Sequence, residues 1–258
     1  MIFEVHLNEK NKIDACNSLL AAWKKQANKV FILRANQHIR DVKCFYEGLF
    51  PYLGKPQAFA EDATIGSRDQ QRTDAIWMEV RYDPTIKNAY RHSSDAQPLH
   101  TDGSYIPNFP STLMCCVANT DKGGETIFID SEDVYQSLSV EEPVLLNHLM
   151  TEKIPHERSG DARSEYPLYQ KNNQHYVNWN YYCVSNQLSA KQKSTVGKFQ
   201  HFLLTSAAIK QHIQAVKLRP GDAVVWKDDQ VLHGRNAFSA NQTSERFIWK
   251  CAIAIQAN

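Results

Sequence analysis

The 258-residue sequence lacks several features that mark specialised classes of protein. No apolar run approaches the roughly 18–20 residues that a membrane-spanning helix needs. The 29 basic residues are balanced by 28 acidic ones, so the charge gives no reason to expect a nucleic acid or an anionic membrane as partner. The chain opens without the basic region of a signal peptide. We therefore expect a cytoplasmic protein whose partner is a small molecule. The sequence does not indicate its oligomeric state.

The six cysteines form no C-x-x-C pair. Cys115 and Cys116 are adjacent in an apolar stretch, and neighbours on a strand point to opposite faces. We expect reduced core cysteines, as is usual in a reducing compartment. A zinc site or a disulfide framework is the alternative.

Internal repeats, low-complexity segments and Gly/Ser-rich linkers are also missing, so we predict one domain over residues 1–258. Its first part, 1–75, is mixed: apolar spacing predicts helices over 14–28 and 41–50, a short apolar run predicts a strand at 30–33, and a polar stretch at 56–76 predicts a long loop. We expect this part to pack on the outside of a core formed by residues 76–258.

The core has the pattern of a mainly β structure. Short apolar runs bounded by turn residues predict strands, and two stretches between them predict helices near 131–138 and 190–204. The predicted strands are 76–82, 112–118, 125–129, 175–182, 223–226 and 247–255. Many short strands with few flanking helices favour a double-stranded β-helix, or jelly-roll barrel.

Two histidines and one carboxylate stand at the ends of predicted strands. His100 and Asp102 are separated by one residue, so they share a face of an extended chain, and His233 precedes Gly234 far downstream. With ten histidines in the chain, about one His-x-acid match is expected by chance, so this pair alone is weak. A barrel brings remote strands together, and the three residues would then form the facial triad that holds non-haem Fe(II).

At this point the sequence resembles a known family over roughly residues 90–255. It is similar to the taurine dioxygenase/γ-butyrobetaine hydroxylase type of Fe(II)/2-oxoglutarate-dependent oxygenases, which includes clavaminate-synthase-like members. The resemblance rests on His100-Thr101-Asp102, Gly123-Gly124-Glu125-Thr126, Pro220-Gly221-Asp222, Leu232-His233-Gly234-Arg235 and Arg246.

The resemblance implies that His100, Asp102 and His233 bind iron, and that Thr126 and Arg246 hold the distal carboxylate of 2-oxoglutarate. An Arg fork pairs with a carboxylate through two parallel hydrogen bonds, and a Thr hydroxyl can donate a further one. One departure from the family is Asp228-Asp229-Gln230, where Asp-Asn is more usual. We expect that change to affect local turn hydrogen bonds and not the metal.

Four further residues are candidates for substrate contact: Tyr105, Asn180, Tyr182 and Arg235. Tyr105 follows the metal motif, and the two residues at 180 and 182 lie on a predicted aromatic strand; core or edge packing is the alternative for all three. Arg235 would brace the turn at His233 by pairing with Asp222, Asp228 or Asp229, or would contact substrate or cosubstrate. The polar stretch 156–163 is either a lid or a plain surface loop.

These features predict a dioxygenase that uses Fe(II), 2-oxoglutarate and O₂ to oxidise a C–H bond of a small molecule, most simply by hydroxylation, with release of succinate and CO₂. A zinc- or manganese-dependent barrel hydrolase or isomerase is one alternative, but it needs no dicarboxylate anchor such as Arg246. A catalytically inactive binding barrel is another, but it has no physical need for three converging metal ligands.

Overall fold

The computed structural model describes residues 1–58, 76–86, 89–158 and 160–256. Its strands are β1 (Ile2–Leu7), β2 (Val30–Ala35), β3 (Gly54–Gln57), β4 (Met78–Arg81), β5 (Gln97–His100), β6 (Ser111–Ala118), β7 (Thr126–Asp130), β8 (Ile154–Arg158), β9 (Asp161–Glu165), β10 (Leu168–Lys171), β11 (Gln174–Val177), β12 (Gln214–Val216), β13 (Ala223–Lys227), β14 (Val231–Arg235) and β15 (Phe247–Ile255).

Helices lie between these strands. They are α1 (Lys12–Trp23), α2 (Val42–Glu47), α3 (Phe50–Leu53), α4 (Ser131–Glu141), α5 (Pro143–Thr151), α6 (Ala190–Thr205) and α7 (Ala207–His212), with 3-10 turns η1 (Tyr90–His92), η2 (Tyr181–Cys183) and η3 (Asp228–Gln230). No helix among the described residues is long and apolar enough to cross a membrane.

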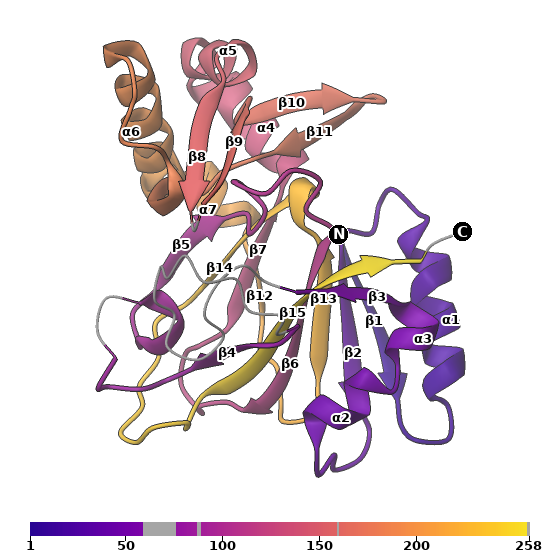
Figure 1. Cartoon of the computed structure of the whole chain (residues 1–258). Helices are drawn as coiled ribbons and strands as arrows, with labels where there is room; N and C mark the ends of the chain where they lie inside the picture. Colours follow the sequence, from indigo (N-terminus) through magenta and orange to yellow (C-terminus); the bar gives the residue numbers. More distant parts are fainter. Residues whose placement is uncertain (59–75, 87–88, 159, 257–258) are drawn as a thin grey trace.

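Two sheets form the core, as expected for a mainly β jelly roll with flanking helices. The larger has the order β1-β2-β13-β6-β15-β3, with β4 also paired to β15, and the smaller has the order β12-β7-β14-β5. All pairs except β1–β2 are antiparallel. Figure 1 shows α1–α3 beside the larger sheet and α4–α7 at the other end of the molecule.

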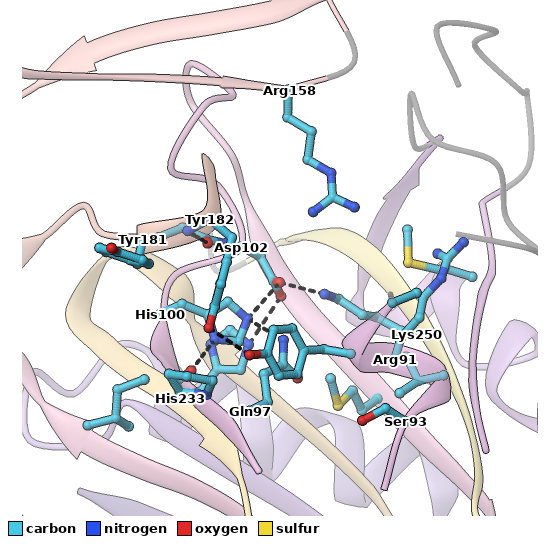
Figure 2. Close-up of a pocket in the computed structure, with 18 of the residues that line it drawn as sticks. Arg91, Ser93, Gln97, His100, Asp102, Arg158, Tyr181, Tyr182, His233 and Lys250 are labelled. Atoms are coloured by element: carbon cyan, nitrogen blue, oxygen red, sulfur yellow. Dashed lines mark hydrogen bonds and ion pairs between the residues drawn. The ribbon is translucent and has the colours of Figure 1, made fainter. Parts of the chain in front are cut away.

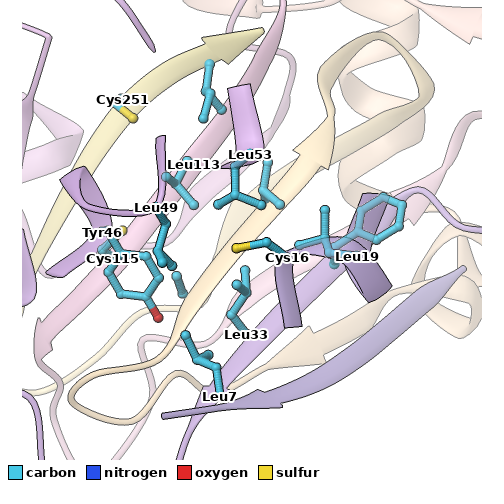
Figure 3. Packing of buried hydrophobic residues seen from close by; sticks show 14 of the residues in the cluster. Leu7, Cys16, Leu19, Leu33, Tyr46, Leu49, Leu53, Leu113, Cys115 and Cys251 are labelled. Carbon is cyan, nitrogen blue, oxygen red and sulfur yellow. The ribbon is translucent and has the colours of Figure 1, made fainter. Parts of the chain in front are cut away.

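Strand alternation divides the buried side chains into layers. On β2, Phe31 and Leu33 pack under α1–α3, whereas Val30 and Ile32 pack between the sheets. Figure 3 shows the first of these layers, in which Cys16 and Leu19 of α1 face Leu33 and Leu113. A third layer joins the outer face of the smaller sheet to α4–α7.

The cysteines follow the same alternation. Cys115 belongs to the layer under α1–α3 and Cys116 to the layer between the sheets, which confirms that the two face different surroundings. All six cysteines are free. Neither a disulfide framework nor a zinc cluster of cysteines is therefore present among the described residues.

The N-terminal part is more closely joined to the core than we expected. Its helices do cover the outside, but β1 and β2 extend the larger sheet through β13, and β3 pairs with β15. The sequence pattern missed this because the pairings of β2 with β13 and of β3 with β15 join segments that are remote in the chain. Most of the predicted loop at 56–76 lies outside the described residues.

Two predicted segments have a different structure. The predicted strand at 175–182 ends at Val177, and Asn180 accepts a hydrogen bond from Tyr182 N and begins the turn η2. The side-chain capping by Asn180 competes with strand pairing there. The stretch 156–163 is not a plain loop, because its described residues belong to the paired strands β8 and β9 or to the turn between them.

Candidate active site

His100, Asp102 and His233 meet at the edge of the smaller sheet. His100 ends β5 and is the cross-strand partner of His233 on β14. One ligand atom from each of the three residues lies within 4.8 Å of the others, the only such group among the described residues. Nε2 of His100 and Nε2 of His233 are 3.7 and 3.6 Å from the Asp102 carboxylate oxygens. Figure 2 shows the three side chains pointing to a common centre.

Gly234 explains how the two strands approach so closely. A Cβ at this position would lie 2.6 Å from the backbone oxygen of Gln97. Glycine alone avoids that clash, so β5 can pair with β14 directly beside the metal residues. The glycine after the distal histidine therefore has a packing role in the site.

Both histidines are held in the form that binds a metal. Burial lowers the pKa of His100, and burial together with His100 lowers the pKa of His233 well below its ordinary value. Nδ1 of His100 donates to the Pro98 carbonyl at 2.9 Å, which leaves Nε2 as an acceptor, and the amide nitrogen of Gln97 lies 3.1 Å from it. Neutral imidazoles oriented in this way are the usual metal-binding state.

Asp102 is ionised despite its burial. Burial opposes ionisation, but the charge of Lys250 outweighs it and lowers the pKa of the carboxyl group. Lys250 Nζ donates to one carboxylate oxygen at 2.5 Å, and Thr112 Oγ1 donates to the other at 2.7 Å. Two neutral nitrogens and one carboxylate, with no fourth protein ligand in the described group, fit the facial triad of non-haem iron.

Asp228 reaches the metal motif, which corrects our expectation that its segment affects only local turn bonds. Its carboxylate accepts from the backbone N–H of Asp102 at 3.0 Å and of Gly103 at 2.8 Å. It also lies 3.9 Å from Nδ1 of His233, an atom with no hydrogen-bond partner among the described residues. Asp228 thus holds the loop that carries Asp102 against the strand that carries His233.

Thr126 begins β7, the strand beside β14, and Arg246 directly precedes β15. Thr126 is the cross-strand partner of Arg235, two residues beyond His233, so its side chain shares the face of the sheet that carries the metal residues. Arg246 is 2% exposed, and its pKa is lowered to about 10 by burial. Its one hydrogen bond within the described residues is a long one, 3.5 Å to Gly124 O, and its Nε has no partner there.

Arg235 braces a different segment from the one we predicted. It pairs with none of the three predicted aspartates; instead one terminal nitrogen donates to three backbone carbonyls, those of Tyr90, Ser93 and Asp95, at 3.1, 2.8 and 2.6 Å. It does not line the cavity beside the triad. Residues remote in sequence supply these carbonyls, so sequence spacing gave no signal for them.

A cavity of about 530 Å³ opens beside the triad. Three of the four predicted substrate residues line it: Tyr105, Asn180 and Tyr182. It is also lined by cations that the sequence reasoning missed, namely Arg91, Arg158 and Lys250. For Lys250 a signal existed, because a lone lysine inside the apolar strand β15 must face either solvent or a polar site.

Comparisons with known proteins give the same picture. The sequence matches the family described as taurine catabolism dioxygenase TauD, TfdA over residues 47–252. A uridine-5'-phosphate dioxygenase of an Amycolatopsis species is 22% identical over 191 residues, covering 70% of this chain and 69% of the relative. A second protein of that name, from a Streptomyces species, is 24% identical over 171 residues, 61% of each chain.

Solved structures share the fold at low sequence identity. An asparagine oxygenase in complex with Fe(II), hydroxyasparagine and succinate superposes with a TM-score of 0.73 at 12% identity, covering 98% of this chain and 93% of that one. The non-heme iron oxygenase OrfP, in complex with Fe and alpha-ketoglutaric acid, superposes with a TM-score of 0.64 at 14% identity. The match covers 95% of this chain and 80% of OrfP. The family match and the curated relatives favour the oxygenase over the hydrolase, isomerase and inactive-barrel alternatives. The chain belongs to the taurine catabolism dioxygenase TauD, TfdA family, and it is a 2-oxoglutarate-dependent dioxygenase.

Proposed function

We propose that His100, Asp102 and His233 hold the Fe(II) of this dioxygenase, which oxidises, most simply by hydroxylation, a C–H bond of a small molecule. The observation that carries the proposal is the convergence of the three ligand atoms within 4.8 Å on one side of a cavity. When bound, iron supplies the activation of O₂, while 2-oxoglutarate is converted to succinate and CO₂. We take residues 1–258 as one oxygenase domain.

The residues around the triad prepare it for the metal. The backbone bond from His100 and the contacts of Asp228 fix the ring and the loop before a metal binds. The three ligand side chains are at most 10% exposed. This burial keeps bulk water away from the reacting centre, which suppresses side reactions.

Arg246, with Thr126, would hold the distal carboxylate of 2-oxoglutarate. Arg246 and Arg235 lie over the same ring, with guanidinium carbons 5.4 and 5.0 Å from the centroid of Phe238. Two adjacent buried cations are costly without an anion, and no carboxylate lies within ion-pair distance of Arg246 among the described residues. A carboxylate of the cosubstrate supplies the missing charge and can accept two bonds from the Arg fork.

The substrate contacts are proposed at Tyr105, Asn180 and Tyr182, which line the cavity. Two relatives are named for uridine 5'-phosphate and one structural neighbour for asparagine. Uridine 5'-phosphate is therefore the first substrate to test, with amino acids next. We also propose a cytoplasmic location, which the six free cysteines favour.

A substrate screen tests this function. The protein is incubated with Fe(II), 2-oxoglutarate and O₂, and succinate formation is measured with uridine 5'-phosphate, uridine, asparagine, arginine or taurine added. We expect one class of compound to raise succinate formation and to gain one oxygen atom by mass spectrometry. Reactions that lack 2-oxoglutarate are the control. Product formation that needs no 2-oxoglutarate would contradict the proposal.

A further inference from the structure

We propose that Gln97 is a further cosubstrate-binding residue. Its side-chain amide competes with the metal for the lone pair of His100 Nε2, and a bound metal turns that amide to the metal-end carboxylate of 2-oxoglutarate. The inference rests on the proposed function, since it takes His100 as a ligand of the iron. It deepens that function by naming a residue at the metal end of the cosubstrate, opposite the end that Arg246 would hold.

A bulge in β5 brings Gln97 to the face of the sheet that carries the metal residues. On β5, Gln97 and His100 are three residues apart. Their partners on β14, Arg235 and His233, are two residues apart, so β5 carries one extra residue where the register shifts. Residues three apart on a regular strand point to opposite faces, whereas a bulge re-aims a side chain. Gln97 and His100 therefore share one face.

The amide of Gln97 donates to the nitrogen of His100 that would bind the metal. The Nε2 atoms of the two side chains are 3.1 Å apart. Nδ1 of His100 donates to the Pro98 carbonyl, so Nε2 of the neutral ring is an acceptor and the amide is the donor. The Gln97 side chain makes no other hydrogen bond to the residues that the structure describes. Figure 2 shows Gln97 beside the rings of His100 and His233.

Gln97 and a metal ion compete for the same lone pair. A neutral imidazole has one acceptor nitrogen, and a metal-bound histidine gives the lone pair of that nitrogen to the ion. Gln97 is partly buried and lines the cavity, where a polar group without a partner costs free energy. Metal binding therefore releases a hydrogen-bond donor that needs a new acceptor beside the metal ligands.

Strand register places this donor beside the cosubstrate. Gln97, Arg235 and Thr126 form one row across β5, β14 and β7. His100 and His233 form the adjacent row on the same face. A cosubstrate that binds the metal and reaches Thr126 joins the two rows, and its other carboxylate stays at the metal end, next to Gln97. A hydrogen bond to a carboxylate is stronger than one to a neutral imidazole, so the amide gains by the exchange.

Metal and cosubstrate affinities test the proposal without turnover. Gln97→Leu removes the competing hydrogen bond, so Fe(II) should bind about two- to tenfold more tightly in the absence of 2-oxoglutarate. Competition with a chelator, without O₂, measures this change. In the Fe(II)-loaded variant, 2-oxoglutarate should bind about tenfold more weakly by calorimetry. Gln97→Glu keeps the size and replaces the donor with a negative charge, so it should weaken 2-oxoglutarate binding further. Gln26→Leu, at an exposed position outside the cavity lining, is the matched control.

The sign of the metal effect separates this role from a purely structural one. If Gln97 only supported the ring of His100, its loss would weaken metal binding by about 10–100-fold. Weaker or unchanged Fe(II) binding in Gln97→Leu, or unchanged 2-oxoglutarate affinity, would overturn the inference. With normal Fe(II) and 2-oxoglutarate binding by the wild type, such a result leaves the proposed function intact. If the wild type binds no Fe(II), the proposed function and this inference fail together.

Discussion

The metal end of the cavity and its outer wall are built in different ways. His100 and His233 are cross-strand partners in the smaller sheet, and their side chains are at most 9% exposed. The outer wall consists of η1, η2 and the tip of the β8–β9 hairpin, where Tyr181 and Tyr182 are 42% and 43% exposed. One end is a pair of hydrogen-bonded strands, and the other is a set of short irregular segments.

This difference separates two tasks. Metal ligands must keep one geometry, which strands of a packed sheet provide. Substrate contacts differ between relatives, and irregular surface segments accept such changes at low cost to the fold. We therefore expect substitutions at the metal end to abolish or strongly weaken metal or 2-oxoglutarate binding. Substitutions at the outer wall should have smaller effects. Four predictions test that contrast, from the largest expected effect to the smallest.

The largest effect is expected at the triad. His233→Ala removes one of the three metal ligands. Loss of a residue that only hydrogen-bonds to a ligand costs about 10–100-fold in metal affinity, so loss of a ligand itself should cost more. Metal content by elemental analysis should fall from one ion per chain to almost none, with circular dichroism unchanged. His201→Ala, on the exposed face of α6, is the control. A stoichiometric ion in His233→Ala would show that the triad is misassigned.

The next effect is expected at Arg246. Loss of a charge-assisted hydrogen bond costs about 1.5–3 kcal/mol, so Arg246→Ala should bind 2-oxoglutarate about 10–100-fold more weakly by calorimetry. Arg246→Lys should be nearly as weak, because lysine lacks the planar fork. Arg40→Ala serves as the exposed control. Wild-type 2-oxoglutarate affinity in Arg246→Ala would remove this residue from the cosubstrate site.

An intermediate effect is expected at Asp228, which touches the metal loop without being a ligand. Asp228→Ala leaves the N–H groups of Asp102 and Gly103 without their acceptor, and metal affinity should fall about tenfold, the lower end of the range for supporting contacts. Asp228→Asn can still accept one of the two bonds and should fall less. Competition with a chelator measures both variants. Asp229→Ala, at the exposed neighbouring position, should match wild type; a similar loss there would mean that the whole turn is responsible.

The smallest effect is expected at the outer wall. Tyr182→Phe removes the hydrogen bond between the hydroxyls of Tyr90 and Tyr182, two partly exposed residues, and the free energy of unfolding in urea should fall by about 1 kcal/mol or less. Metal and 2-oxoglutarate binding should be unchanged. Tyr181→Phe, at the adjacent and equally exposed position, is the control. A loss of metal from Tyr182→Phe would contradict the view that the outer wall does not support the metal site.

The elements that sequence periodicity predicted best are those whose own residues carry a clear apolar pattern. The helices at α1, α4 and α6 and the strands at β2, β6 and β15 lie where apolar spacing placed them. The segment after Val177 was predicted as a strand because it is aromatic, but side-chain capping by Asn180 turns it into η2. Strand β3 was missed because it is a short polar stretch whose hydrogen-bond partner, β15, is remote in the chain.

The sequence by itself determined the family, the types of the metal ligands and the local spacing of His100 and Asp102, since a motif keeps residue types and short-range geometry. Only the tertiary structure decided that Arg235 braces η1, that Asp228 reaches the metal loop, and that Arg91, Arg158 and Lys250 share one cavity. The physical reason is that these contacts join segments far apart in the chain. Strand register and packing set such distances, and neither can be read from the spacing of residues along the sequence.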